Sequence, residues 1–311
     1  MNDFNLSIVI PIYNNSGSLS ELISALTTVQ NELSFPLEVI FVIDGSPDDS
    51  YSHLMKLMPV QGISFQVLTL SRNFGSFAAI REGFKVASGE NIACISADMQ
   101  EPPSILIDFY QVLNDGNIDV VVGKRLSRND GFLGNISSKF FWRIFRKFVN
   151  KDVPNGGVDV FAFNRKVLIQ IIRLAEQNTS LVGLVYWVGF RRGVVNYERM
   201  KRKHGESGWT LRKKVRYFED SIFSFTSLPI ISLQVIGGVG VILSTIVATT
   251  VLIFWLNSSI PIPGYTPLII TILASTSSIL LGLGIVGSYT WRAYENTKNR
   301  PGAIVSSHQE F

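Results

Sequence analysis

The first 125 residues alternate between short apolar runs and segments whose apolar residues recur at helical spacing. The runs end in polar or glycine-rich turns, so they predict strands, and the amphipathic segments between them predict helices. This alternation predicts an α/β domain with a mostly parallel sheet covered on both faces. The expected strands are LSIVIPIY, LEVIFVID, FQVLTLS, NIACIS and DVVVGKR, and the expected helices include GSLSELISALTTVQNEL, SFAAIREGFKVAS and PSILIDFYQVLND.

Two later stretches, residues 229–255 and 267–291, contain no charged residue. Each exceeds the roughly 20 residues that a helix needs to cross a bilayer, and their glycines would permit close helix contact. A pair of buried core helices is the alternative. We expect a catalytic domain over 1–210, a juxtamembrane helix over 211–228, two transmembrane helices within 229–291 and a tail over 292–311.

Basic residues gather beside these uncharged stretches, at Arg212, Lys213, Lys214 and Arg216 before them and at Arg292, Lys298 and Arg300 after them. The positive-inside rule then places both termini in the cytoplasm. The N-terminus has no basic segment followed by a long apolar one, so no signal peptide is expected. The net charge of +4 is better matched by an anionic membrane surface than by nucleic acid.

One segment, within residues 137–151, interleaves aromatic and basic residues as SSKFFWRIFRKFV. A helix of this kind suits the headgroup region of a membrane; a surface helix packed on the domain is the alternative. Residues 210–225 are a second candidate. Cys94 is the only cysteine, so no intramolecular disulfide can form, and its apolar strand predicts core packing.

Acidic side chains follow two of the predicted strands. Asp44 ends VIFVID before a glycine turn, and Asp98 follows NIACIS within ISADMQEPP. Ligands of such sheets bind beyond the carboxyl ends of the strands. Asp98 could hold a hard cation, because Mg²⁺ often uses one or two carboxylates together with substrate phosphates. Taken singly, each acid is equally compatible with an ordinary loop cap.

Several segments in fixed order resemble glycosyltransferase family 2, and within it the polyprenyl-phosphate glycosyltransferases. That branch includes dolichol-phosphate mannose synthase, bactoprenol-phosphate glucosyltransferases and the undecaprenyl-phosphate aminoarabinose transferase. The resemblance runs over essentially the whole chain. The segments are SIVIPIYNN, VIDGSPDDS, LSRNFGSFAAIREGF, ISADMQEPP, YERMKRKHGESGWTLRKK and GSYTWRAYENTKNRP.

The resemblance implies a GT-A domain that moves a sugar, with inversion, from a nucleotide donor, most simply UDP-linked, to undecaprenyl phosphate. It implies Mg²⁺ or Mn²⁺ as cofactor, the bacterial inner membrane as location, a product for cell-envelope glycan or lipopolysaccharide modification, and a homo-oligomer, with a tetramer suggested. The residues implied are Pro11, Tyr13, Asp44, Arg72, Asn73, Ser96 and Gln100 for the donor, Asp98 for the metal and catalysis, Asp159 for catalysis on the acceptor side, and Arg199, Arg202 and Ser207 for phosphates.

The acceptor chemistry narrows the role of Asp159. A phosphate monoester has a second pKa of about 6, so it is largely a dianion near neutral pH. Such a nucleophile needs little help from a general base. We therefore expect Asp159 to orient the acceptor or to stabilise an oxocarbenium-like carbon; an ordinary loop acid is the alternative. The basic run from Arg199 to Lys203 would lower the repulsion between two polyanions, or would only form a solvated face near lipid.

The chain departs from the family pattern at Asn15, Ile43, Ser96 and Gly208, where the family carries three acids and a lysine. These departures bear on the sugar and on the tightness of metal binding. Two rival functions remain. A processive polysaccharide synthase would carry Q-x-x-R-W, but Gln170 and Arg173 lack the following tryptophan. A membrane-anchored nucleotide-sugar-binding protein without activity would explain the missing acids.

Overall fold

The structure is a computed structural model of the chain. It describes residues 4–126, 141–154, 157–174, 176, 179–203, 211–256, 265–298 and 300–311. The chain divides into two compact units, the first formed by residues 1–221 together with 300–311 and the second by residues 222–299. The chain therefore leaves the first unit once and returns to it.

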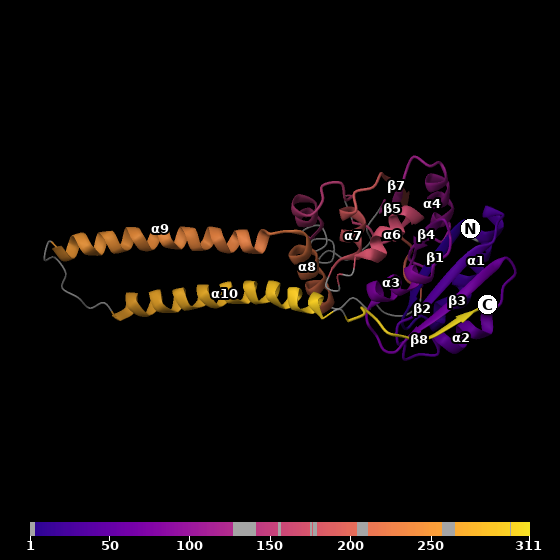
Figure 1. The fold of residues 1–311 in the computed structure, drawn as a ribbon, viewed down its shortest axis with the longest axis horizontal. Helices are drawn as coiled ribbons and strands as arrows, with labels where there is room; N and C mark the ends of the chain where they lie inside the picture. The colour runs from indigo at the N-terminus through magenta and orange to yellow at the C-terminus, as the bar shows by residue number, and fades with distance from the viewer. Residues whose placement is uncertain are drawn as a thin grey trace. The chain divides into compact units, whose positions relative to one another are not determined.

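An eight-stranded sheet forms the centre of the first unit, in the order β7-β5-β6-β4-β1-β2-β3-β8 (Figure 1). β6 runs antiparallel to its neighbours β4 and β5, and β8 runs antiparallel to β3, whereas the other pairs are parallel. The predicted mostly parallel sheet is confirmed. Its strands are β1 Leu6–Ile12, β2 Leu37–Ile43, β3 Ile63–Leu70, β4 Asn91–Cys94, β5 Val120–Arg125, β6 Phe161–Asn164, β7 Arg192–Tyr197 and β8 Val305–Glu310.

Helices cover both faces of this sheet and form two separate apolar clusters. Successive side chains of a strand point to opposite faces, so Ile8 and Ile10 of β1 lie in one cluster and Val9 lies in the other. The first cluster contains α1 Leu19–Leu33, which follows the 3₁₀ turn Ser16–Ser18, with α2 Ser50–Leu57 and α4 Ile105–Asn114. The second contains α3 Ser76–Val86, α6 Arg165–Arg173 and α7 Leu181–Trp187.

Burial explains why the central strands contain so few polar residues. All seven residues of β2 are buried, because helices cover a parallel sheet on both sides. Chain order reverses beside β1: β2 and β3 lie on one side of it and β4 lies on the other. In open sheets of this kind, a crevice forms at the carboxyl ends of the strands where the order reverses.

The aromatic and basic segment is helical over residues 141–148, the part of it that the structure describes. Phe145 is fully buried, and Phe141 packs against Phe145, Tyr217 and Phe218. Phe148, in contrast, is 39% exposed. These contacts match the packed surface helix more closely than a helix free to lie in headgroups, although a membrane contact through the exposed side stays a prediction.

The second unit contains two long helices, α9 Leu228–Leu256 and α10 Tyr265–Thr297. α8 Leu211–Phe225 precedes them, where the sequence predicts a juxtamembrane helix. Within the described residues, one stretch is long and apolar enough to cross a membrane, Leu228–Val247, with a mean hydropathy of 2.2. None of that stretch is buried, which is unlike the core helix of a soluble domain. The second predicted span is not confirmed.

The end of the chain differs from expectation. The sequence predicts a cytoplasmic tail over 292–311 and no strand within it is named, whereas β8 joins the sheet beside β3 and appears in yellow in Figure 1. A short polar segment, VSSHQE, has no apolar pattern that would predict a strand. Pairing with the edge of β3 supplies its hydrogen bonds, so the tertiary structure determines it.

Candidate active site

The candidate site begins at the carboxyl ends of β1 and β4, which are neighbours in the sheet. Ser18, which is buried, donates a hydrogen bond from Oγ to the carbonyl oxygen of Ala97 at 2.7 Å. This contact joins the loop after β1 to the ISADMQEPP segment after β4. The segments that follow β1 and β4 are therefore in contact at this edge of the sheet.

The ISADMQEPP segment forms a tight turn around its aspartate. Asp98 Oδ1 accepts hydrogen bonds from Ser96 Oγ at 2.7 Å and from the backbone N–H of Gln100 at 3.1 Å. Met99, between them, has a φ of 58°, a left-handed conformation that side chains with a Cβ seldom adopt. The turn fixes the Asp98 carboxylate and presents Gln100 beside it.

Glu101 is a buried carboxyl group that the sequence analysis did not single out. It is 4% exposed, and its Oε2 contacts Ser96 Oγ. Burial, followed by the charges of Asp159 and Asp98, raises the pKa of Glu101 to about 7, against the hydrogen bond from Ser96 and the charge of Arg199. The Ser96 hydroxyl has one hydrogen and meets two carboxyl groups. A proton on Glu101 lets that carboxyl group donate the second hydrogen bond, to the Ser96 oxygen.

The basic segment after β7 lies against this turn. The backbone N–H of Met200 donates to the carbonyl oxygen of Gln100 at 2.8 Å. Arg202 Nη2 lies 2.5 Å from Asp98 Oδ2, and Arg199 Nη2 donates to Gln100 Oε1 at 2.6 Å. The fold thus brings together side chains about a hundred positions apart in the sequence. Binding of phosphates by Arg199 and Arg202 stays a prediction.

Asp159 lies just before β6. Because β6 runs antiparallel to β5, its beginning lies at the same edge of the sheet as the ends of β5 and β7. Asp159 Oδ2 accepts hydrogen bonds from Arg125 Nε and, at 2.9 Å, from the hydroxyl of Tyr197. Burial alone would lower the pKa of Arg125, but the charge and hydrogen bond of Asp159 outweigh it and raise that pKa. Burial, then Asp159 and Glu101, raises the pKa of Tyr197. Arg125 stays charged and Tyr197 stays neutral.

Of the predicted donor residues Pro11 and Tyr13, Pro11 lies within β1 and Tyr13 begins the loop after it. Pro11 is paired with Val42 in the sheet, and the ring of Tyr13 is partly exposed. Asp48 shapes this loop: its oxygens accept from the N–H of Ser16 at 3.0 Å and from Ser46 Oγ at 2.6 Å. Burial would raise the pKa of Asp48, but its hydrogen bonds outweigh burial and lower it. Asp48 therefore remains a carboxylate that supports the loop.

Asp44 is buried at the end of β2 and holds the loop after β3. Its two carboxylate oxygens accept from the N–H groups of Phe74 and Gly75, at 2.7 and 2.8 Å. Arg72 lies over the ring of Phe74, 4.4 Å from its centroid, and Arg72 and Asn73 are exposed. The predicted donor residues Asp44, Arg72 and Asn73 therefore belong to one arrangement, in which Asp44 positions the loop that carries the other two.

Residues 7–173 match the family described as Glycosyl transferase family 2. The chain belongs to glycosyltransferase family 2. It is 32% identical over 302 residues to an uncharacterized glycosyltransferase of Synechocystis sp., covering 97% of this chain and 94% of that protein. Both this match and the family assignment make the protein a glycosyltransferase, with a GT-A-like sheet.

Two further relatives of this glycosyltransferase have more specific names. A prophage-derived bactoprenol glucosyl transferase of Shigella flexneri is 28% identical, with 98% of each chain covered. The undecaprenyl-phosphate 4-deoxy-4-formamido-L-arabinose transferase of Aeromonas hydrophila is 29% identical, with 96% of this chain and 92% of that one covered. Among solved structures, glucosyl-3-phosphoglycerate synthase of Mycobacterium tuberculosis has a TM-score of 0.47 at 16% identity, covering 66% and 73% of the two chains.

Three side chains of the glycosyltransferase site were missed from the sequence: Glu101, Arg125 and Tyr197. Glu101 stands inside the quoted ISADMQEPP segment, and Arg125 and Tyr197 each end a strand. Position at a strand end is a signal that could have identified the last two. Ser207, predicted for phosphate binding, lies outside the described residues. The remaining predicted residues stay predictions as ligands, although the contacts above place them.

The oxygen atoms around Asp98 fit a hard divalent cation. Carboxylate, hydroxyl and amide oxygens are supplied by Asp98, Ser96 and Gln100, and a site of this kind is completed by substrate phosphates and water. Within the described ranges, no group of three or more acidic, histidine or cysteine side chains forms a metal cage. Asp98, Ser96 and Gln100 therefore suit part of the coordination of such a cation, and Arg202 lies against one of the two Asp98 oxygens.

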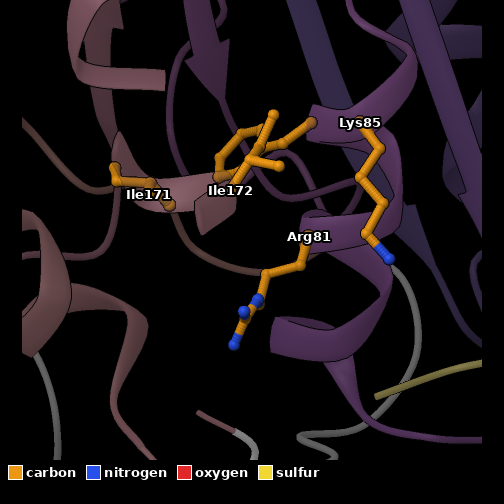
Figure 2. Close-up of a pocket in the computed structure, with 5 residues that line it drawn as sticks. Arg81, Lys85, Ile171 and Ile172 are labelled. Atoms are coloured by element: carbon orange, nitrogen blue, oxygen red, sulfur yellow. The ribbon is translucent and has the colours of Figure 1, made fainter. Parts of the chain in front are cut away.

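A small pocket elsewhere in the glycosyltransferase is lined by residues of α3 and α6 (Figure 2). Its residues are Arg81, Phe84, Lys85, Ile171 and Ile172. Arg81 Nη1 donates to the carbonyl oxygen of Glu176 at 2.5 Å, and Nη2 donates to that of Leu174. No predicted site residue lines this pocket, and Arg81 uses its guanidinium to hold the chain after α6.

Proposed function

We propose that this enzyme transfers a sugar, with inversion, from a UDP-linked donor to undecaprenyl phosphate and forms a lipid-linked monosaccharide. The observation that carries the proposal is the meeting of Asp98, Glu101 and Asp159 with Arg125, Arg199 and Arg202 at the carboxyl edge of the sheet. Two phosphorylated substrates meet at one sugar carbon, and their negative charges repel each other unless positively charged side chains lie beside them. The acidic side chains hold those positively charged side chains in place. The names of the two bacterial relatives support a polyprenyl phosphate acceptor.

The donor side is assigned to the loops after β1, β2 and β3. Tyr13 offers an aromatic face for a base, Asp44 holds the loop of Arg72 and Asn73, and Asp98 with Ser96 and Gln100 receives the diphosphate end. A bound Mg²⁺ or Mn²⁺ would neutralise the negative charge that develops on the leaving nucleoside diphosphate. Asp98 would hold it, and Arg202, on leaving Asp98, would turn its guanidinium to the donor phosphates.

The acceptor side is assigned to Asp159 and its two partners. The acceptor phosphate is already a nucleophile near neutral pH, so the site does not need a strong base. Asp159 is engaged by Arg125 and Tyr197 through one oxygen, which suits a carboxylate that orients neighbouring groups and stabilises positive charge at the reacting carbon. Arg125 and Arg199 then supply cationic groups beside the incoming phosphate.

We also propose that the second unit crosses the bacterial inner membrane twice. Leu228–Val247 is apolar and unburied, and α10 has 33 residues, enough to span at about 1.5 Å per residue. The sheet adds an independent argument. Because β8 pairs with β3, the segments before and after the second unit lie on the same side of any membrane. The number of crossings between them is therefore even, and the basic flanks assign that side to the cytoplasm.

The test of activity uses purified full-length protein with undecaprenyl phosphate, a panel of UDP-sugars and Mn²⁺ or Mg²⁺, followed by mass analysis of the lipid. A lipid carrying one sugar supports the proposal. A long polymer would instead support a processive synthase, and donor binding without product would support an inactive binding protein. The same preparation, sized in detergent, tests the proposed tetramer.

The test of topology uses labelling of single cysteines. Cys94 is buried, and burial raises the pKa of its thiol, so the native background is low. A cysteine introduced at Ser258, between α9 and α10, should react with an impermeant reagent added outside intact cells. A cysteine at the exposed Ser306 should react only after the cells are opened. Labelling of both from outside, or of neither, would contradict two crossings.

A further inference from the structure

The last strand of the chain contacts the loop that carries two predicted donor residues. β8 pairs with β3 from Gln66 to Leu70, and Phe65 and Phe311 exchange both backbone hydrogen bonds. Beyond the strand, the N–H of Ser71 donates to the carbonyl oxygen of Ile304 at 2.9 Å. The C-terminal segment thus reaches the first residue of the loop after β3.

That loop, residues 71–75, is held at both ends. Ser71 is bonded to the C-terminal segment, and Phe74 and Gly75 are bonded to the carboxylate of Asp44. Arg72 and Asn73 lie between these two attachments and are exposed. Fixing the backbone of a residue costs conformational entropy, so a loop that is ordered before the ligand arrives binds it more tightly.

The C-terminal segment is attached by more than its backbone. Ala303 is 4% exposed and lies in the apolar cluster that contains Leu70. Ser306 Oγ donates to the carbonyl oxygen of Thr69 at 2.9 Å, and the hydroxyl of Tyr51 donates to Gln309 Oε1 at 3.0 Å. The register shifts between Thr69 and Leu70, immediately before the loop. The C-terminal segment is therefore attached by side chains as well as by backbone up to the point where the 71–75 loop begins.

We propose that β8 is a positioning element of the donor site, which orders Arg72 and Asn73 for a nucleoside diphosphate. The inference rests on the proposed function, because that function makes the loop a donor loop. A strand that only covered the edge of β3 would protect the sheet from aggregation but would leave nucleotide affinity unchanged. A variant in which β8 is released from β3 distinguishes these two roles, because only the positioning role predicts a loss of nucleotide affinity.

The variants use the alternation of an antiparallel pair. Since Phe65 and Phe311 form a hydrogen-bonded pair, the pairs Val67 with Gln309 and Thr69 with Ser307 are also hydrogen-bonded, and the N–H of Glu310 points away from β3. Ser307→Pro removes a ladder donor close to the loop. Glu310→Pro is the matched control, with a proline in the same strand and no ladder donor lost.

The experiment measures UDP affinity by calorimetry, donor and acceptor KM, and hydrogen exchange at the Ser71 amide, all in the full-length protein. Ser307→Pro should speed exchange at Ser71, weaken UDP binding about tenfold and raise donor KM similarly, while kcat and acceptor KM change little. Glu310→Pro should behave as the unmodified protein. If Ser307→Pro does not fold, the double variant Ser306→Ala with Gln309→Ala, which loosens β8 through side chains, should give smaller changes of the same direction.

The outcomes are distinguishable. Faster exchange at Ser71 with unchanged UDP affinity overturns the inference and leaves the proposed function intact. Equal losses of donor and acceptor affinity in Ser307→Pro and Glu310→Pro indicate general destabilisation and also overturn it. If the unmodified protein neither binds UDP nor uses a UDP-sugar, the proposed function fails, and the inference fails with it.

Discussion

Arg202 Nη2 lies 2.5 Å from Asp98 Oδ2. The acid expected to hold a divalent cation is thus paired with a guanidinium. Cation and guanidinium compete for the same oxygen, so Arg202→Gln should tighten binding of Mn²⁺ to the donor-free protein, about threefold to tenfold. The same change should weaken UDP binding, because it removes a positive charge beside the diphosphate.

Electron paramagnetic resonance of free Mn²⁺ measures the first effect, and calorimetry with UDP measures the second. Lys203→Gln is the matched control, since Lys203 is paired with Glu21 rather than Asp98. Weaker Mn²⁺ binding in Arg202→Gln than in the unmodified protein would contradict competition at Asp98.

Ser96 and Asp98 should differ sharply in their effects on turnover. Asp98 is the carboxylate that would contact the cation, whereas the Ser96 hydroxyl donates a hydrogen bond to the Asp98 carboxylate at 2.7 Å. Asp98→Ala should lower kcat by roughly a hundredfold or more, and Ser96→Ala by less than about tenfold. Initial rates of transfer to undecaprenyl phosphate at saturating Mn²⁺ give the comparison. An inactive Ser96→Ala beside an active Asp98→Ala would reverse the assignment.

Glu101 should make stability depend on pH. Its pKa is raised to about 7 in the folded protein, against about 4.3 in an unfolded chain. The folded state therefore holds the proton more tightly, and the contribution to stability is full below about pH 4 and is lost as the pH rises through 7. The Glu101→Gln variant has no ionisable group at this position, so it does not lose this contribution as the pH rises. The difference in free energy of unfolding, variant minus unmodified protein, should therefore increase by up to about 3 kcal/mol between acidic and mildly alkaline pH.

The measurement is the Tm in detergent with a chelator present, at about pH 5 and about pH 8, bracketing the raised pKa. Glu21→Gln controls for the loss of an acid outside this turn, at a half-buried residue paired with Lys203. A difference in Tm between Glu101→Gln and the unmodified protein that is the same at both pH values would show that Glu101 does not titrate in this range.

Gly45 should tolerate no side chain. It has a φ of +57°, and a Cβ atom there would lie 2.4 Å from the backbone carbon of Arg72. Gly45→Ala should therefore displace the 71–75 loop and lower both stability and UDP affinity. Gly116→Ala is the control: its φ is +73°, but a Cβ atom would meet no atom within 4 Å. The control should lose about 1 kcal/mol from its backbone conformation alone, as measured by chemical unfolding, with UDP affinity unchanged.

Sequence patterns identified the parallel strands, the helices between them and the polar strand ends, because side-chain periodicity and burial on two faces leave a direct record in the order of residues. Asp98, Gln100, Arg199 and Arg202 were selected from the motifs, and the fold brings them into contact. Their roles as ligands remain predictions. The long uncharged stretches predicted the two helices of the second unit, of which one stretch passes as a membrane span.

Only the tertiary structure decided which charges meet. The pairing of Arg125 with Asp159, and the burial of Glu101 beside Ser96, depend on β6 running against its neighbours and on the chain after β7 folding back over the turn. No local periodicity records the pairing of Arg125 with Asp159, because 34 positions separate them in the sequence. Nor does it record the burial of Glu101, which depends on the segments that pack over its turn. The same holds for β8, a polar segment that becomes a strand because the edge of β3 offers it hydrogen bonds. The sequence therefore determined the elements that have a periodic apolar pattern, while packing decided β8 and the contacts of the site.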